Sequence, residues 1–248
     1  MHRESLAHRV ESQFGNQLPE SPLLCFLDET DWQPFKLEQG KANRGLYVPI
    51  EHKEPYWLDW PAAVVNCVMV AEPPPVWNRR IFDHVIYLHG GTCEKDAGLV
   101  MTFAHELQHF VQHETAPERW AESRVVANLT KDDIRTLKLN SFDIPIERES
   151  RAVSKHVAEK LFGTETVRRY IDDRINENIS SADVEDWKFI RELDPSIPYD
   201  LKIETRLLYL RLKDYRPQLE ETLQLCKNEL CDPAFDRVDI DRLLDGGA

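Results

Sequence analysis

Residues 83–112 read DHVIYLHGGTCEKDAGLVMTFAHELQHFVQ, and this stretch decides the fold. Its first part, Asp83 to His89, is short and rich in β-branched and aromatic residues, and the turn pair Gly90-Gly91 follows it, which predicts a strand. Asp96 can cap the helix that comes next. From Ala97 to Gln112 apolar residues recur three and four positions apart. This spacing is typical of an amphipathic helix with one buried face.

Strands are predicted before this stretch and helices after it. Leu46 to Ile50 and Ala63 to Val70 are apolar runs that predict two further strands. Residues 1–45 predict a short helix, Glu4 to Phe14, and then a connection that contains prolines. Downstream, Pro145 fits the first turn of one helix, and Pro217 predicts a kink or break in another. The predicted helices are 119–129, 132–139, 146–162, 164–178, 182–193 and 200–228.

This order of elements favours an α+β domain with a small mixed or antiparallel sheet and a largely helical C-terminal half. We expect residues 1–248 to form a single domain. Within it, residues 1–45 are expected to be an N-terminal extension, residues 46–162 the core, and residues 163–248 a helical subdomain.

Composition narrows the class of protein. Of the 248 residues, 42% are hydrophobic and 30% are charged, an ordinary balance for a chain with a packed core. The net charge of −13 opposes binding to nucleic acid or anionic membranes, so we expect neither partner. We expect no membrane span and no secretory signal, since the apolar runs are short. The five irregularly spaced cysteines favour a reducing, cytoplasmic location.

His105-Glu106-Leu107-Gln108-His109 has the spacing of a metal-binding helix. Residues four apart lie one turn from each other, so the imidazoles of His105 and His109 can reach one ion. Glu106 is placed to address a water on that ion without displacing a ligand. His113 follows His109 at the same spacing of four residues. Each step of four rotates the side chain further around the helix axis, so three such histidines point in directions too different to share one ion. We therefore expect His113 to be a neighbour on the helix surface or a group on the substrate side.

A third protein ligand is needed, and the sequence offers two carboxylates, Glu147 and Glu149. On a helical wheel Glu147 lies near the middle of the apolar face of the predicted helix 146–162, whereas Glu149 points to its flank. A carboxylate on a buried face needs a partner, and zinc is one, so we favour Glu147. Glu149 stays open as the alternative. An alternative explanation for Glu147 needs no metal, since an acid in the first turn of a helix complements the helix dipole.

The stretch Phe103 to Gln112 resembles the active-site helix of bacterial gluzincin-type metallopeptidases and is similar to that of the ImmA/IrrE-like group. Pro145-Ile146-Glu147-Arg148-Glu149-Ser150 fits their P-x-E-x-E-A phrase, with serine in place of alanine. Arg151 stands where such proteins often carry an Asp that orients a ligand histidine. The resemblance covers roughly residues 80–162. It implies a zincin-like fold, a Zn²⁺ ion bound by His105, His109 and Glu147, and Glu106 as the general base.

From the motif and the resemblance we expect a zinc-dependent metallopeptidase that hydrolyses peptide or protein substrates. An extended substrate would add to the edge of the strand Val85 to Leu88. The sequence does not rank the candidates for oxyanion stabiliser or fix the oligomeric state. One alternative is a catalytically silent zincin-like binding or regulatory protein. Another is a different zinc-dependent amide hydrolase such as a deformylase, although Cys93 is too near the helix for that pattern. The oxyanion candidates are His84, His89, Tyr87 and Tyr170.

Overall fold

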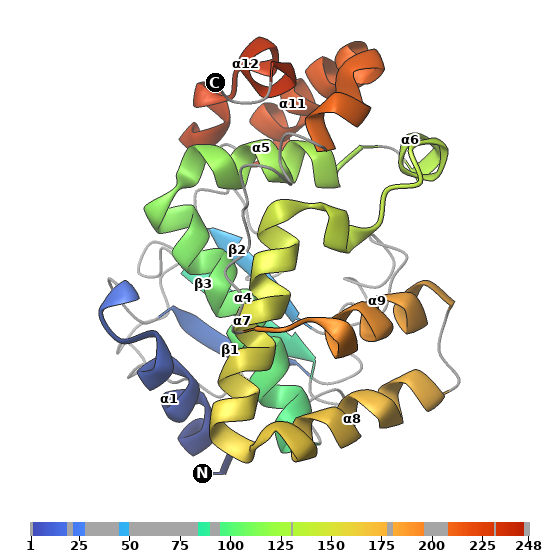
Figure 1. Cartoon of the computed structure of the whole chain (residues 1–248). Coiled ribbons are helices and arrows are strands. Elements are labelled where there is room, and N and C mark those ends of the chain that lie inside the picture. Colours follow the sequence, from blue (N-terminus) through green and yellow to red (C-terminus); the bar gives the residue numbers. More distant parts are fainter. Residues whose placement is uncertain are drawn as a thin grey trace, which may run out of the picture.

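The computed structural model describes a mostly helical chain with one small sheet, which agrees with the α+β class (Figure 1). The residues that it describes are 2–18, 22–27, 45–49, 84–89, 95–129, 131–177, 181–195, 208–230 and 232–245. The strand predicted at 63–70 and Cys93 lie outside these ranges, so those two predictions are not tested.

The sheet has three strands in the order β1-β3-β2. The central strand, β3 (His84–His89), pairs in parallel with β1 (Leu23–Leu27) and antiparallel with β2 (Gly45–Pro49). Two of these strands confirm the sequence prediction, whereas β1 lies in a segment predicted to be a connection. It is a run of five apolar residues directly after Pro22, and it forms a strand because β3 offers it a partner. The N-terminal segment therefore contributes to the sheet.

The helices agree closely with the periodicity of the sequence, and Pro217 marks a break, as predicted. It lies in the first turn of α11, after a 3-10 turn, so the predicted helix 200–228 is interrupted before it. The helices whose bounds are described are α1 (His2–Phe14), α4 (Asp96–Thr115), α5 (Pro117–Ala127), α6 (Lys131–Thr136), α7 (Pro145–Phe162), α8 (Thr164–Asn176), α9 (Ser181–Glu192), α11 (Arg216–Leu230) and α12 (Ile240–Leu244). Short 3-10 turns are η1 (Gly15–Gln17), η3 (Ser141–Asp143), η4 (Lys213–Tyr215) and η5 (Pro233–Arg237).

Helix α4 is the centre of the core, because it contacts α7, α1 and the strands β2 and β3 (Figure 1). Phe103, Leu107 and Phe110 on this helix are fully buried, as the predicted apolar face requires. Burying one such side chain stabilises a fold by ~1.5–3 kcal/mol, so α4 is held firmly in place. Its polar residues are thereby fixed in position as well.

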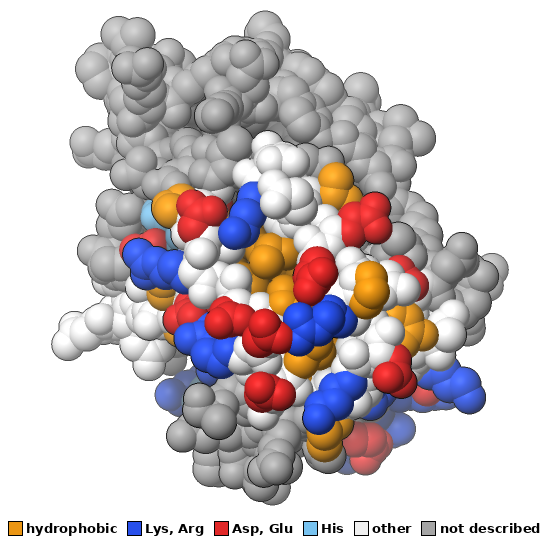
Figure 2. Space-filling model, turned by 90° about the horizontal axis from the view of Figure 1, so that it is seen from above, with side chains coloured by type: hydrophobic (Ala, Val, Ile, Leu, Met, Phe, Trp, Pro, Cys, Tyr) orange, Lys and Arg blue, Asp and Glu red, His pale blue; other side chains and the backbone are white. Residues whose placement is uncertain are grey.

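The face seen in Figure 2 carries acidic and basic side chains interspersed around apolar ones. Charged side chains also pair on the C-terminal helices, for example Arg216 with Glu220 at 3.2 Å and Lys227 with Asp236 at 3.6 Å. Exposed pairs of this kind contribute little to the stability of the fold. Buried leucines such as Leu219 therefore hold this layer together. Among the described helices, none has the length and apolar composition that crossing a bilayer requires.

Strand β2 lies so close to α4 that Gly45 cannot carry a side chain without a collision. A Cβ atom there would lie 2.8 Å from Cγ of Glu106 and 2.9 Å from Cγ2 of Thr102. Its backbone is not in the left-handed region, so the need for glycine at this position is one of space alone.

Replacing Gly45 with alanine is expected to destabilise the protein by ~1–3 kcal/mol, since extra atoms in a packed contact force their neighbours to move. The displaced neighbour is Glu106, so the geometry of the site described below should change too. Chemical denaturation gives the first effect and a metal-affinity titration the second. Gly15→Ala is the control for the metal site. Its positive φ of 53° makes alanine strained there, but nothing lies near the added Cβ atom, so stability should fall while metal affinity stays unchanged. A Gly45→Ala protein as stable as the parent would contradict the close packing.

Candidate metal centre

The structure brings His105, His109 and Glu147 together at one point between α4 and α7. The two Nε2 atoms lie 3.1 Å apart, and carboxylate oxygens of Glu147 lie 3.4 Å from each of them. The histidines come from successive turns of α4, and the acid comes from the first turn of α7. These are the three residues that the sequence favoured as ligands.

The donor atoms fit a zinc ion. Zinc binds imidazole nitrogen and carboxylate oxygen at ~2.0–2.2 Å, which sets donors of a tetrahedral site roughly 3.3–3.5 Å apart. Two imidazole nitrogens at 3.1 Å need a proton or a cation between them, because two lone pairs repel each other. The side chains of His105 and Glu147 keep 19% and 18% of their surface exposed, which leaves room for a water ligand. The group can therefore hold a metal ion.

The charges of the site favour a cation. Burial acts to raise the pKa of Glu147, but the neighbouring His109 and His105 hold this pKa well below its usual range, so the carboxyl group is ionised. Burial acts to lower the pKa of His109, yet the charge and hydrogen bond of Glu147 raise it above its ordinary value. The buried carboxylate thus draws positive charge to His109 Nε2, where either a proton or a metal ion can supply it.

Gln112 fixes the orientation of His109. Its side-chain nitrogen donates to the carbonyl oxygen of Ile146 at 3.0 Å and to Oε2 of Glu149 at 2.8 Å. Its oxygen therefore faces His109, where it accepts a hydrogen bond from Nδ1–H at 2.9 Å. The Oγ of Ser150 lies 3.3 Å from the same nitrogen. With Nδ1 protonated, Nε2 presents its lone pair to the centre.

Glu149, the alternative ligand, belongs to this supporting network. Its carboxylate accepts hydrogen bonds from Gln112 and, at 3.3 Å, from Arg119. The two acids of the P-x-E-x-E phrase therefore have different surroundings. Glu147 faces the imidazoles, and Glu149 faces the amide that holds one of them.

Arg151 holds the Glu147 carboxylate from the other side. It donates to Oε2 of Glu147 at 2.8 Å and also to Asp186 on α9 at 2.8 Å. In the sequence, Arg151 stands out only as a departure from the family pattern. Its position four residues after Glu147 was the available signal, because side chains at this spacing meet on a helix.

Glu106 lies on the face of α4 that contacts β2, and only 7% of it is exposed. Its Oε2 accepts a hydrogen bond of 2.9 Å from the backbone N–H of Tyr47. Its charge also contributes to the raised pKa of His109, so it lies within electrostatic reach of the centre. The strand thus holds the predicted general base in one orientation.

The other residues singled out in the sequence lie elsewhere. Tyr87 is inside the core, and Tyr170 packs against Trp187 with 5.7 Å between ring centroids. His84 and His89 are at opposite ends of β3, and His84 lies with His113 in a separate cluster. The expected substrate edge along β3 is wrong, because β1 and β2 already occupy both of its edges.

A cavity of about 340 Å³ adjoins the supporting network. Gln112, Arg119 and Glu149 line it together with Gln108 and Trp120. It therefore borders the residues that orient His109.

Replacing Gln112 with leucine is expected to weaken zinc binding by ~10–100-fold, the usual effect of losing a group that orients a ligand histidine. Competition with a chromogenic chelator measures the affinity. Gln108→Leu is the matched control, because Gln108 is another buried glutamine of α4 that lines the same cavity. Equal zinc affinities for the two variants would exclude the orienting role.

No protein-family model, curated protein or solved structure matches this chain. The function must therefore be inferred from the side chains of the candidate centre and their surroundings.

Proposed function

We propose that the chain is a zinc-dependent metallopeptidase with a zincin-like core. His105, His109 and Glu147 would bind the ion, and Glu106 would act as the general base. The observation that carries the proposal is the convergence of two imidazoles from α4 and one ionised carboxylate from α7. A second acid, Glu106, lies on α4 between the two histidines in the sequence. The composition and the irregular set of five cysteines favour a cytoplasmic location.

Bound zinc supplies an acidified water and polarises a carbonyl group. Glu106 would accept a proton from a water held there and pass it to the leaving amine. The Tyr47 N–H engages one carboxylate oxygen of Glu106, which fixes the direction of the other. Gln112 and Arg151 keep His109 and Glu147 in position without taking part in proton transfer.

An extended substrate fits best along the outer edge of β2. Among the described strands, β2 pairs only with β3, so its second edge is not covered by another described strand. The Tyr47 N–H donates to Glu106, which shows that the Glu106 carboxylate lies beside the backbone of β2. Because the Tyr47 N–H is taken by Glu106, a peptide at this edge would bond to the remaining backbone groups of β2, close to the general base.

The proposal is tested by digesting a generic peptide library with purified protein. Cleavage should be lost with a zinc chelator and restored by added Zn²⁺. Digests by Glu106→Gln protein prepared in parallel control for contaminating proteases. Metal binding without cleavage would favour the silent binding or regulatory protein, and the absence of bound metal would exclude both.

A further inference from the structure

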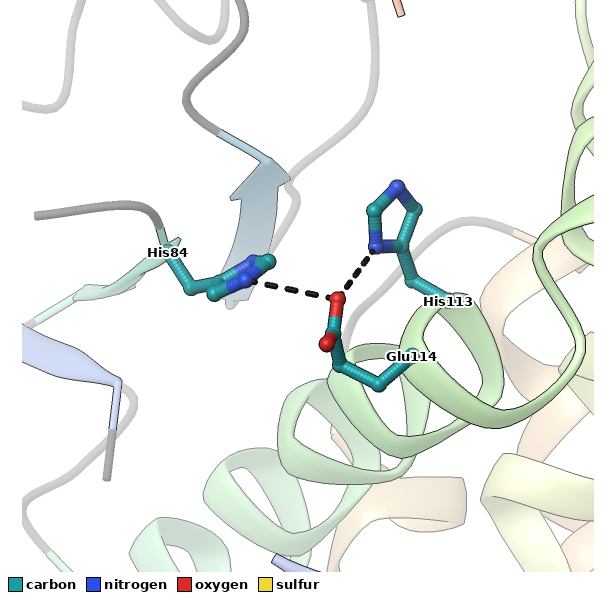
Figure 3. Close-up of side chains that lie close together, drawn as sticks. All are labelled: His84, His113 and Glu114. Atoms are coloured by element: carbon teal, nitrogen blue, oxygen red, sulfur yellow. Dashed lines mark hydrogen bonds and ion pairs between the residues drawn. The ribbon is translucent and has the colours of Figure 1, made fainter. Parts of the chain in front are cut away.

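A second group of potential ligands lies at the far end of α4 (Figure 3). His84 comes from the start of β3, and His113 and Glu114 come from the last turn of α4. Oε1 of Glu114 lies 3.4 Å from Nε2 of His84 and 3.1 Å from Nδ1 of His113. Figure 3 shows both rings directed toward this one oxygen.

Each imidazole is held by its outer nitrogen. Nε2 of His113 lies 2.8 Å from Oδ2 of Asp232, and Nδ1 of His84 lies 2.8 Å from the hydroxyl oxygen of Tyr47. When Nε2–H of His113 donates to Asp232, its Nδ1 presents a lone pair to Glu114. When Nδ1–H of His84 donates to the Tyr47 hydroxyl, Nε2 of His84 likewise presents a lone pair to Glu114. A carboxylate such as Asp232 is a usual support of a metal-binding imidazole, and the Tyr47 hydroxyl can hold His84 in the same way.

The cluster is enclosed enough to be rigid and open enough to admit an ion. The side chains of His84, His113 and Asp232 are 10%, 14% and 4% exposed, whereas that of Glu114 is 33% exposed. His84 packs against Phe110, and His113 packs edge-on against Trp120 at 4.7 Å. The aromatic rings hold the histidines, and Glu114 faces solvent.

With these tautomers, three acceptor atoms converge and repel one another unless a cation lies between them. Either a proton on His113 or a metal ion can meet this need. The donor set of two imidazoles and one carboxylate, each histidine supported from behind, matches a zinc site with an open position.

We propose that His84, His113 and Glu114 form a second binding site for a divalent transition-metal ion, of which zinc is the best match. A bound ion would tie the start of β3 to the end of α4. This second site does not depend on the proposed hydrolysis, since none of its ligands belongs to the first centre. Tyr47 touches both groups, with its backbone on Glu106 and its side chain on His84.

The test is a count of bound zinc after metal-free protein is equilibrated with buffered Zn²⁺, using elemental analysis and isothermal titration. The wild-type protein should bind two equivalents, and Glu114→Gln should bind one. Asp232→Asn, which keeps an oxygen to cap Ala234 N–H, should weaken the second site by ~10–100-fold. Glu165→Gln, a change at an exposed acid in the first turn of α8, is the control and should bind two.

Variants of the first centre keep the two proposals separate. His105→Ala/His109→Ala should retain one equivalent, and Glu147→Gln serves as a milder version if the double variant does not fold. If the wild type and the first-centre variant that is used each bind one ion, the second site stands and the first centre fails. If Glu114→Gln binds as much zinc as the wild type, the second site is refuted, and a proton holds the cluster together.

Discussion

Replacing Glu106 with glutamine should leave the zinc content unchanged and lower kcat by roughly 10²–10⁴-fold, the usual contribution of a general base. Glutamine has nearly the same shape, and its side-chain oxygen can still accept the hydrogen bond from Tyr47 N–H. It cannot take a proton from water at neutral pH. The measurement combines elemental analysis with the rate of hydrolysis of a peptide that the library digest identifies.

The same Glu165→Gln protein is the control, since it removes one negative charge from an exposed position on α8. Wild-type turnover by Glu106→Gln, in a preparation free of the parent enzyme, would remove Glu106 from the mechanism. Loss of zinc together with activity would show instead that this acid supports the metal centre.

Replacing Glu147 with glutamine should weaken zinc binding by more than the ~10–100-fold typical of a supporting group, because the variant removes the charged ligand itself. It also takes away one of the two carboxylates that balance the buried Arg151. A stability loss on the order of 1–3 kcal/mol is expected, because Arg151 loses a charged hydrogen-bond partner and keeps only Asp186. Chelator competition and urea denaturation measure the two effects.

Glu149→Gln, two residues along the same helix, separates the two carboxylates that the sequence left open. Glu149 contacts Gln112 and Arg119, so its loss should reduce zinc affinity less than the loss of Glu147 does. The opposite order of affinities would make Glu149 the ligand.

The sequence predicted those elements whose signals are local. The periodicity of α4, the prolines that begin α5 and α7, and the glycine after α7 set the helix bounds within a few residues. The pairing of His105 with His109 follows from helix geometry alone. Placing Glu147 beside them needed one further step, a helical wheel that assigned it to the buried face.

The remaining features depend on contacts between distant parts of the chain. The parallel pairing of β1 with β3 has no local signal, and without it β3 seemed to offer an edge for substrate. The hydrogen bond from Tyr47 to Glu106 joins residues 59 positions apart, and that from His113 to Asp232 joins residues 119 positions apart. No periodicity within a single element can reveal such partners.

Arg151 bears on how the chain can be shortened. It is 7% exposed and shares its charge between Glu147 on α7 and Asp186 on α9. A fragment that stopped at Phe162 would keep every proposed ligand of the first centre. It would nevertheless leave a guanidinium with a single carboxylate, and this carboxylate would then have to serve both the arginine and the metal. A fragment that keeps both carboxylate partners of Arg151 must therefore extend beyond Asp186.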